Sequence, residues 1–490
     1  MRMHRLTQGT VVPEKGPTNI WMQVVSATLA GLALRLLFIW QFPNEVADSL
    51  VYEELARNWW DHRVYGLFLN GTLTPVLIRV PGYPVFLAVV YLFLGRSRLA
   101  VMLVQVAVDV GTCFLTAVLA ASLVPQSLHR RVFLAALWLA ATCPFVAMYT
   151  VVPLTEVLVT FLTTAALLLL VRNCQASDAS HVVGGHRWRV SPWSLAGLLV
   201  GLGSLVRPET PLLLVAVGLV LFLRWRLPTD WPKLFRAAAL IAVGLILPLL
   251  PWAARNWHTF HRVQFFTPRY YAMPGDYVPR GFYAWTNTWL VRMRDAFQVF
   301  WKLEGDSIPI ENVPASAFDS PEERTRVQTL LERYNVTTVV TPEIDRGFGE
   351  LARQRAARHP LRTYVWIPVR RAVSLWFTPR DDLLLEGDYP VFPPYSTHLW
   401  PPTEQWEEDP LGFSVTVFLA LLNVFYLALA LLALWRWRWS SSGIVLLVAF
   451  ILVRTAFMST VEAPEPRYVL ECFPAVLSLA ALAWARPAHP

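Results

Sequence analysis

Long apolar stretches alternate with short polar segments along most of the 490-residue chain. A helix needs about 20 apolar residues to cross the hydrocarbon core of a membrane. Eight stretches approach or exceed that length, at 21–41, 99–124, 132–150, 154–172, 236–252, 411–434, 442–459 and 468–485. Each of them predicts one membrane-spanning helix.

Two further apolar stretches need separate interpretation. The stretch at 193–224 is interrupted by Arg207-Pro208-Glu209, and we interpret it as two short spans joined by a charged turn. The stretch at 83–95 has only about 13 apolar residues, which is typical of an interfacial helix. The pattern therefore predicts ten crossings, or eleven if 83–95 also spans the membrane.

The distribution of charge predicts the orientation. With the N-terminus in the cytoplasm, the cytoplasmic segments hold about 15 Lys or Arg and three acids, and the opposite side holds about 25 bases and 30 acids. Cytoplasmic loops are enriched in Lys and Arg. The formal charge of +8 therefore reflects topology and does not indicate nucleic acid as a partner. With 55% hydrophobic and only 16% charged residues, the composition excludes a plain soluble enzyme.

A long polar segment divides the spans into two groups. It is rich in Pro and aromatic residues, and the orientation places it on the same face as the first external loop, 44–98. Stretches such as ERTRVQTLLERYNV have the apolar spacing of amphipathic helices. The expected organisation is a transmembrane module at 1–252, an extracytoplasmic α or α/β domain at 253–410, and C-terminal transmembrane helices at 411–490.

Neither the four cysteines nor the ten histidines have metal-ligand spacing. There is no CxxC pair and no HExxH sequence, and the cysteines lie in or beside apolar stretches, where they are typical buried residues. No metal ligand is assigned from the sequence.

Two isolated carboxylates fall on the predicted external face. Asp48 begins an amphipathic helix soon after the first span, where it could act as a catalytic carboxylate or only cap the helix. Glu156 lies at the external end of an otherwise uncharged helix, where an acid is costly unless it is wetted, neutral or paired. It could also be an interfacial Glu that interacts with the helix N-terminus.

Several arginines accompany these acids. Arginine binds phosphate through paired donors and keeps its charge when partly buried. Simpler interpretations also exist: a salt-bridged turn for Arg207 and Glu209, and interfacial arginines at the ends of spans for Arg255 and Arg467. Arg35 and Arg454 lie inside spans and could pair with Asp109 or another internal acid. Because ATP and nucleotide sugars are absent outside the cell, a phosphate-linked lipid donor would suit such a site.

These residues belong to an ordered set that resembles a known family, the GT-C glycosyltransferases of the family 39-like group. That group includes the protein O-mannosyltransferases and the bacterial lipid A aminoarabinose transferase. The set consists of Asp48-x3-Tyr52-x3-Ala56, the R-x-PGYP turn from Arg79 to Pro84 with Tyr83, Glu156, the GLxxGLxxLxRP run that ends at Arg207-Pro208, PWxxRN with Arg255, and Glu465-Pro-Arg467-Tyr468.

The resemblance implies an all-α GT-C fold and an inverting membrane glycosyltransferase, a hexosyl or pentosyl transferase. The donor would be a sugar on a polyprenyl phosphate such as undecaprenyl phosphate, and the acceptor a lipid, a glycan or a protein. The enzyme would be a multi-pass protein of the bacterial inner membrane with a periplasmic active site, surrounded by membrane lipids.

The resemblance also implies roles for individual residues. Asp48 would take the proton of the acceptor hydroxyl, and Glu156 would orient the acceptor or assist the acid and base arrangement. The expected substrate-binding residues are Tyr52, Arg79, Tyr83, Arg207, Glu209, Arg255, Arg454, Arg467 and Tyr468. RVPGYP stands where some relatives have a KPP-type segment for substrate or metal, so no cofactor is assigned and a divalent cation is left open.

Two other classes of protein share some of these features. A transporter or flippase could use ten spans and internal charges, although the hydropathy shows no inverted repeat. A polysaccharide polymerase or ligase that acts on lipid diphosphate would also need external arginines, but would not require the Asp48 helix.

Overall fold

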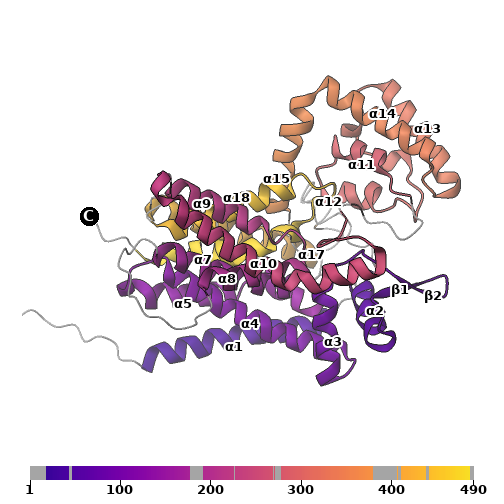
Figure 1. Cartoon of the computed structure of the whole chain (residues 1–490). Coiled ribbons are helices and arrows are strands. Elements are labelled where there is room, and N and C mark those ends of the chain that lie inside the picture. Colours follow the sequence, from indigo (N-terminus) through magenta and orange to yellow (C-terminus); the bar gives the residue numbers. More distant parts are fainter. Residues whose placement is uncertain are drawn as a thin grey trace, which may run out of the picture.

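The protein is a bundle of long helices with a separate helical domain at one end (Figure 1). The computed structural model describes residues 18–43, 47–176, 191–225, 227–268, 270, 277–378, 406, 410–437 and 441–485. The one sheet in these residues is an antiparallel hairpin of β1, Gly66–Leu69, and β2, Thr72–Pro75.

Six helices in the described part of the chain are long and apolar enough to cross a membrane. They are α1 (Thr18–Gln41), α4 (Arg98–Ser122), α7 (Glu156–Ala176), α10 (Trp231–Phe260), α17 (Pro410–Trp437) and the segment Pro466–Trp484, which contains η8 (Pro466–Cys472), α19 (Phe473–Ala481) and η9 (Leu482–Trp484). A seventh candidate is bent by 49° and consists of η1 (Gln126–Leu128), α5 (His129–Ala141), α6 (Pro144–Ala147) and η2 (Met148–Val151).

Four shorter apolar helices complete the set: α3 (Gly82–Leu94), α8 (Pro192–Val206), α9 (Leu212–Arg224) and α18 (Ser442–Met458). Every apolar stretch of the sequence thus forms helix in the described residues. If α8, α9 and α18 cross and α3 lies at the interface, the number of crossings is the predicted ten. That number stays a prediction, because length and composition alone do not fix it.

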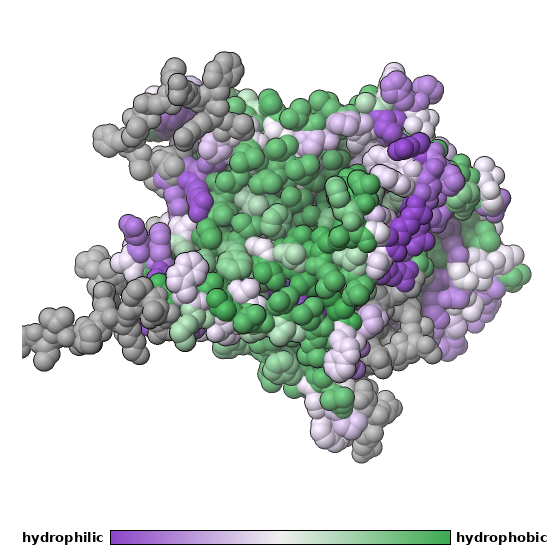
Figure 2. All heavy atoms as spheres, turned by 90° about the horizontal axis from the view of Figure 1, so that it is seen from below, coloured by the Kyte–Doolittle hydropathy of each residue, from purple (hydrophilic) through white to green (hydrophobic). Residues whose placement is uncertain are grey.

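The outer surface of the bundle matches a membrane environment. Figure 2 shows apolar residues (green) as a broad continuous area with hydrophilic residues (purple) to either side. Large exposed apolar side chains on α1, α10 and α17 contribute to the surface of the molecule, among them Trp21, Leu247 and Leu421. Such a surface would be costly in water, and lipid can cover it.

The charged turn at Arg207-Pro208-Glu209 joins two helices, as the sequence predicted. Arg207 lies 3.1 Å from Glu156 at the start of α7, whereas Arg224 at the end of α9 donates to the carbonyl of Cys174 near the end of α7. Helix α9 therefore follows α7 from one end of the bundle to the other, and the turn lies at the Glu156 end.

Glycines allow α8 and α10 to approach closely. A Cβ at Gly197 would lie 2.2 Å from the carbonyl oxygen of Ile241, and one at Gly201 would lie 2.5 Å from that of Leu245. Small residues permit such backbone contact between membrane helices. Because the contacts advance in the same direction along both helices, α8 and α10 are parallel. Arg207 and Arg255 therefore lie at the same end of the bundle.

An ion pair in the middle of the bundle fixes α1 against α4. Arg35 Nε donates to Asp109 Oδ2 over 2.6 Å, and Arg35 Nη1 donates to the carbonyls of Gly31 and Ala141, each over 2.8 Å. Both charged side chains are almost completely buried. The sequence allowed for this pairing of Arg35 with Asp109 as one of two interpretations, the other being a pairing with another internal acid.

The polar segment forms a helical domain with its own core. It contains α11 (Arg280–Asn287), α12 (Met293–Asp295), α13 (Pro321–Thr337), α14 (Pro342–Arg358), and the continuous helix of η7 (Arg362–Trp366) and α15 (Ile367–Phe377). Phe282, Trp285 and Phe348 pack at its centre. Within its described residues the domain is α, not α/β. Helix α10 continues to Phe260, so the apolar stretch 236–252 is the middle of a longer helix.

Candidate functional site

Asp48 lies in the first turn of α2 (Ala47–His62), a helix outside the long spans. Arg79 Nη2 donates to Asp48 Oδ1 over 2.7 Å, and Arg467 Nη2 donates to Oδ2 over 3.2 Å. The side chain of Asp48 is 31% exposed. Two arginines from distant parts of the sequence therefore hold a carboxylate that solvent or a substrate can still reach.

Glu156 lies deeper, at the first residue of α7. Arg207 Nη2 donates to Glu156 Oε1 over 3.1 Å, and Arg467 Nη1 lies 3.8 Å from the same oxygen. The side chain of Glu156 is only 3% exposed. Because Arg467 contacts both Asp48 and Glu156, it connects the two carboxylates that the sequence singled out.

A third group of charges continues the cluster into the bundle. Arg454 Nη2 donates to Glu471 Oε1 over 2.5 Å and lies 3.6 Å from Glu209 Oε1. Arg207 completes this group, since its Nε lies 3.6 Å from Glu209 and its Nη1 lies 3.8 Å from Glu471. Thr163 on α7 donates to the other oxygen of Glu471 over 3.1 Å.

The residues at the start of η8, together with Glu465 just before it, surround the centre of the cluster. Arg467 Nε lies 2.5 Å from Glu465 Oε2, and the Tyr468 hydroxyl donates to Glu465 Oε1. The Tyr468 ring faces the Arg207 guanidinium at 5.8 Å. The Glu-Pro-Arg-Tyr sequence therefore places a carboxylate, a guanidinium group and an aromatic ring close together.

We call this set of ion-paired residues the charged cluster. Its members are Asp48, Arg79, Glu156, Arg207, Glu209, Arg454, Glu465, Arg467 and Glu471. If all are ionised, five carboxylates face four guanidinium groups. A phosphate that enters must therefore compete with carboxylates for the arginines.

Aromatic residues pack around the helix that carries Asp48. Tyr52, one turn after Asp48, packs edge-on against Tyr83 with ring centroids 5.2 Å apart, and the Arg79 guanidinium lies 5.9 Å from the Tyr52 ring. The Tyr83 hydroxyl donates to Gln105 on α4 over 2.7 Å. Tyr52 and Tyr83 thus position Arg79 and α2, and both tyrosines are buried residues.

Arg255 lies apart from the charged cluster. It donates to the carbonyl of Tyr65 over 2.7 Å and to that of Val76 over 3.2 Å, and its guanidinium faces the rings of Tyr65, Trp252 and Phe260. Its contacts in the described part of the chain include none of the cluster carboxylates. Arg255 therefore fixes the β1–β2 hairpin to the end of α10.

The surroundings of Asp48 and Tyr52 change their acidity in opposite directions. Burial alone would raise the pKa of Asp48, but the charges of Arg467 and Arg79 outweigh this and hold its pKa below the ordinary value. Burial raises the pKa of Tyr52 to about 12. Asp48 is therefore an ionised carboxylate at neutral pH, and Tyr52 is a neutral phenol.

The sequence pattern does not single out Glu471 as a site residue, and it includes Glu465 only within the EPRY motif. Glu471 lies in the predicted last span and is almost fully buried between Arg207 and Arg454. An acid inside an apolar stretch is itself a signal of function or pairing. Among the described residues, no group of three or more His, Cys, Asp and Glu is arranged to hold a metal ion.

Comparison with known proteins identifies the fold. No protein-family model matches the sequence, and no curated protein matches it. The oligosaccharyltransferase of Archaeoglobus fulgidus in the apo form superposes with a TM-score of 0.50 at 15% sequence identity, over 95% of this chain and 50% of that one. The archaeal oligosaccharyltransferase AglB from the same organism, in complex with an inhibitory peptide and a dolichol-phosphate, gives a TM-score of 0.49 at 15% identity, with the same coverage.

The chain is thus an all-α polytopic membrane protein with the GT-C fold. It spans about half the length of the solved oligosaccharyltransferases that it matches. At this level of identity the similarity concerns the fold, so the chemistry must be argued from the residues.

Proposed function

We propose that this protein is an inverting glycosyltransferase that moves a sugar from a polyprenyl-phosphate donor to an acceptor at the charged cluster. The observation that carries the proposal is the position of Asp48. It is an ionised and partly exposed carboxylate between Arg79 and Arg467, at the end of the bundle beside the helical domain. The GT-C fold shared with an oligosaccharyltransferase supports the same reaction class by analogy.

In the proposed reaction the acceptor hydroxyl attacks the anomeric carbon while the bond from that carbon to the lipid-phosphate oxygen breaks. Asp48 takes the hydroxyl proton, and the lipid phosphate leaves with the bonding electrons. A single displacement of this kind inverts the anomeric centre. One carboxylate is sufficient, because a phosphate is a good leaving group and needs no general acid.

Arginines of the charged cluster would bind the departing phosphate. Arg207 Nη1 is buried and has no hydrogen-bond partner among the described residues, and Arg467 Nη2 reaches the accessible Asp48. Donors that wait in place for developing negative charge are an effective source of catalysis. We assign the phosphate to Arg207 and Arg467.

The same assignment explains how Asp48 could act as a base. A carboxylate that two arginines hold in ion pairs is a weak base, and a general base works best with a pKa closer to the working pH. Lipid phosphate that draws Arg467 away from Asp48 would raise the pKa of this carboxyl. The base would thus become stronger only when the donor is bound.

Glu156 has a different part in this proposal. It is much less exposed than Asp48, and it contacts Arg207 and Arg467. Glu156 therefore orients the two phosphate-binding arginines, in place of direct contact with the acceptor. Glu209, Arg454 and Tyr468 support the same arginines from the bundle side.

The test compares Asp48→Asn with a control on the same helix. Purified variants are supplied with a synthetic sugar-phosphate polyprenol, and the released polyprenyl phosphate is measured. Loss of a general base costs about 10²- to 10⁴-fold in rate. Asp61→Asn is the control, because Asp61 is also on α2 and pairs with Arg96 away from the cluster. Near-normal transfer by Asp48→Asn would remove the residue from this role.

A polymerase or ligase that uses a lipid-diphosphate donor is the second candidate. It is favoured by the number of arginines in the cluster, since four guanidinium groups could serve two phosphates. Parallel assays with monophosphate and diphosphate donors of the same sugar and lipid distinguish the two. We expect turnover of the monophosphate donor only.

The location and the acceptor are also proposals. We place the protein in the bacterial inner membrane, with the charged cluster on the periplasmic side and the N-terminus in the cytoplasm. The acceptor is a lipid, a glycan or a protein that reaches Asp48 from outside the membrane. A membrane-impermeant thiol reagent should label a Cys introduced at Asp319 but not one introduced at Arg236, and the reverse pattern would contradict this orientation.

A further inference from the structure

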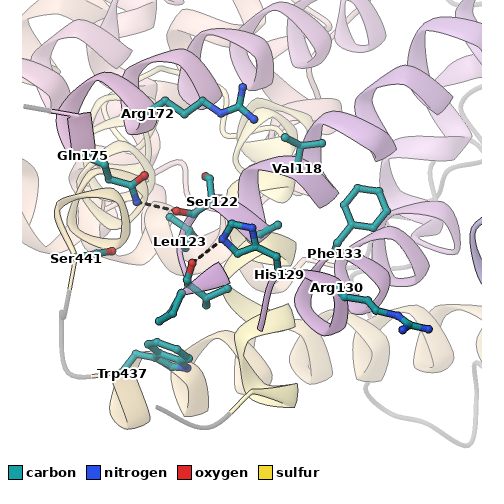
Figure 3. A pocket seen from close by; sticks show the side chains of 13 residues that line it. Val118, Ser122, Leu123, His129, Arg130, Phe133, Arg172, Gln175, Trp437 and Ser441 are labelled. Carbon is teal, nitrogen blue, oxygen red and sulfur yellow. Dashed lines mark hydrogen bonds between the residues drawn. The ribbon is translucent and has the colours of Figure 1, made fainter. Parts of the chain in front are cut away.

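A cavity of about 1010 Å³ lies at the end of the bundle opposite the charged cluster (Figure 3). It is bounded by the ends of α4, α7 and α17 and by the start of α5. Glu156 begins α7 at the charged cluster, and Gln175, near the end of the same helix, lines the cavity. A helix advances about 28 Å over that distance, so the cavity and the cluster are on opposite sides of the bundle.

The inner wall of the cavity is apolar. Val118 on α4, Phe133 on α5 and Trp437 at the end of α17 line it. Trp437 is buried, and its Nε1 donates to the carbonyl of Leu482 over 3.3 Å. The polar part of this tryptophan is therefore already satisfied, and the wall offers apolar contact.

Two polar side chains at the cavity are occupied by hydrogen bonds within the protein. His129 Nε2 lies 2.9 Å from the carbonyl oxygen of Val124, and Gln175 Nε2 donates to the carbonyl of Ser122 over 2.8 Å (Figure 3). Both bonds connect the end of α4 to its neighbours. They keep the rim of the cavity in place.

The two arginines at the cavity are different. Arg130 and Arg172 are exposed, and in the described part of the chain neither makes an ion pair or a side-chain hydrogen bond. In Figure 3 they lie on either side of Val118 and Phe133. None of the residues that line the cavity is an acid, again among the described residues. Among the described residues, two positive charges thus flank an apolar cavity that has no counter-charge.

We propose that this cavity binds one anionic phospholipid, with the headgroup at the rim that carries Arg130 and Arg172 and the upper acyl chains against Val118, Phe133 and Trp437. Arginine binds phosphate through paired donors, and the apolar wall removes acyl carbons from water. The predicted orientation places the cavity at the cytoplasmic leaflet, where anionic lipids attract basic residues. The proposal does not depend on the transferase activity.

The test titrates the full-length protein with lipid and counts the lipids retained by native mass spectrometry. Palmitoyl-oleoyl phosphatidylglycerol is compared with phosphatidylcholine of the same chains. We expect one tightly retained phosphatidylglycerol in excess of phosphatidylcholine. Arg130→Gln/Arg172→Gln should weaken its retention by about 20- to 30-fold, since one arginine near a membrane surface contributes a factor of about five.

A matched control distinguishes a site from general surface charge. Arg236 is exposed on α10 near the same end of the bundle and does not line the cavity. Arg236→Gln should retain phosphatidylglycerol as the unsubstituted protein does. An equal loss in this control, or no loss in the double variant, would overturn the proposal. So would displacement of the lipid by millimolar inorganic phosphate, because the site would then bind free phosphate and not a lipid.

Discussion

Two acid–arginine arrangements in this molecule use the same chemistry in different surroundings. Arg35 and Asp109 are enclosed in the middle of the bundle. Arg35 also donates hydrogen bonds to the carbonyls of Gly31 and Ala141 there. The side chain of Asp48 is 31% exposed. Its partners Arg79 and Arg467 are also partly exposed to solvent, and Arg467 pairs with Glu465 as well. An enclosed and satisfied pair can only hold helices together, whereas an open and shared one can exchange partners with a substrate.

The largest expected effects separate the two arrangements by what they damage. Asp109→Leu leaves Arg35 as an uncompensated buried charge, which costs about 3–5 kcal/mol of stability. The double variant Arg35→Leu/Asp109→Leu should recover most of that loss. Asp48→Asn should slow transfer by about 10²- to 10⁴-fold and leave the unfolding midpoint nearly unchanged. Thermal unfolding in detergent measures the first effect, and a stable Asp109→Leu protein would contradict the distinction.

Glu471 tests whether the charged cluster works as one unit. Glu471→Gln weakens the hydrogen bond from Arg454 and removes the charge that lies 3.8 Å from Arg207 Nη1. Hydrogen bonds to charged groups contribute about 1.5–3 kcal/mol, so transfer should fall roughly 10- to 100-fold. Thr163→Val is the control, because it removes the neutral partner of the same carboxylate. Equal, small effects from both would assign Glu471 to packing alone.

The pH dependence tests the exchange of partners at Asp48. Arg467 and Arg79 outweigh burial and hold the pKa of Asp48 below its ordinary value, so the carboxylate stays ionised as the pH falls toward that lower pKa. The acid limb of kcat/KM reports the free enzyme, and that of kcat reports the enzyme–substrate complex. We expect the kcat limb at higher pH than the kcat/KM limb. Arg79→Gln should move the kcat/KM limb upward, and coincident limbs would exclude the exchange.

The smallest effect is expected at Arg255. Arg255→Gln loses hydrogen bonds to the carbonyls of Tyr65 and Val76 but touches no cluster carboxylate in the described residues. Stability should fall by about 1 kcal/mol, the typical net contribution of a hydrogen bond, and kcat should change less than three-fold. A loss of transfer as large as that of Arg467→Gln would place Arg255 with the phosphate-binding arginines after all.

The helices were largely predictable because their signal is local. A run of apolar residues predicts a membrane helix directly, and the interruption at Arg207-Pro208-Glu209 indicated a turn between two helices. The convergence of Asp48, Glu156 and Arg467 could be expected from their common placement at the external ends of helices and from the family resemblance. Their individual contacts could not.

Two details could not be read from the sequence, for a common physical reason. Glu471 was absorbed into an apolar stretch, although its charge inside a span was a usable signal. Arg255 is predicted to bind substrate with the other arginines because it also lies at the external end of a span, and that role stays a prediction. Sequence position gives the depth of a residue but not the direction of its side chain, and in the structure Arg255 turns toward the hairpin carbonyls.

The position of a bound lipid phosphate tests the central claim most directly. A cryo-electron microscopy map of the full-length protein with undecaprenyl phosphate should show phosphate density within hydrogen-bond distance of Arg207 and Arg467, next to Asp48. The account predicts that Arg467 then lies farther from Asp48 than the 3.2 Å observed without the ligand. Phosphate density only at the Arg130 and Arg172 cavity, or none at saturating lipid, would contradict the assignment of the charged cluster as the donor site.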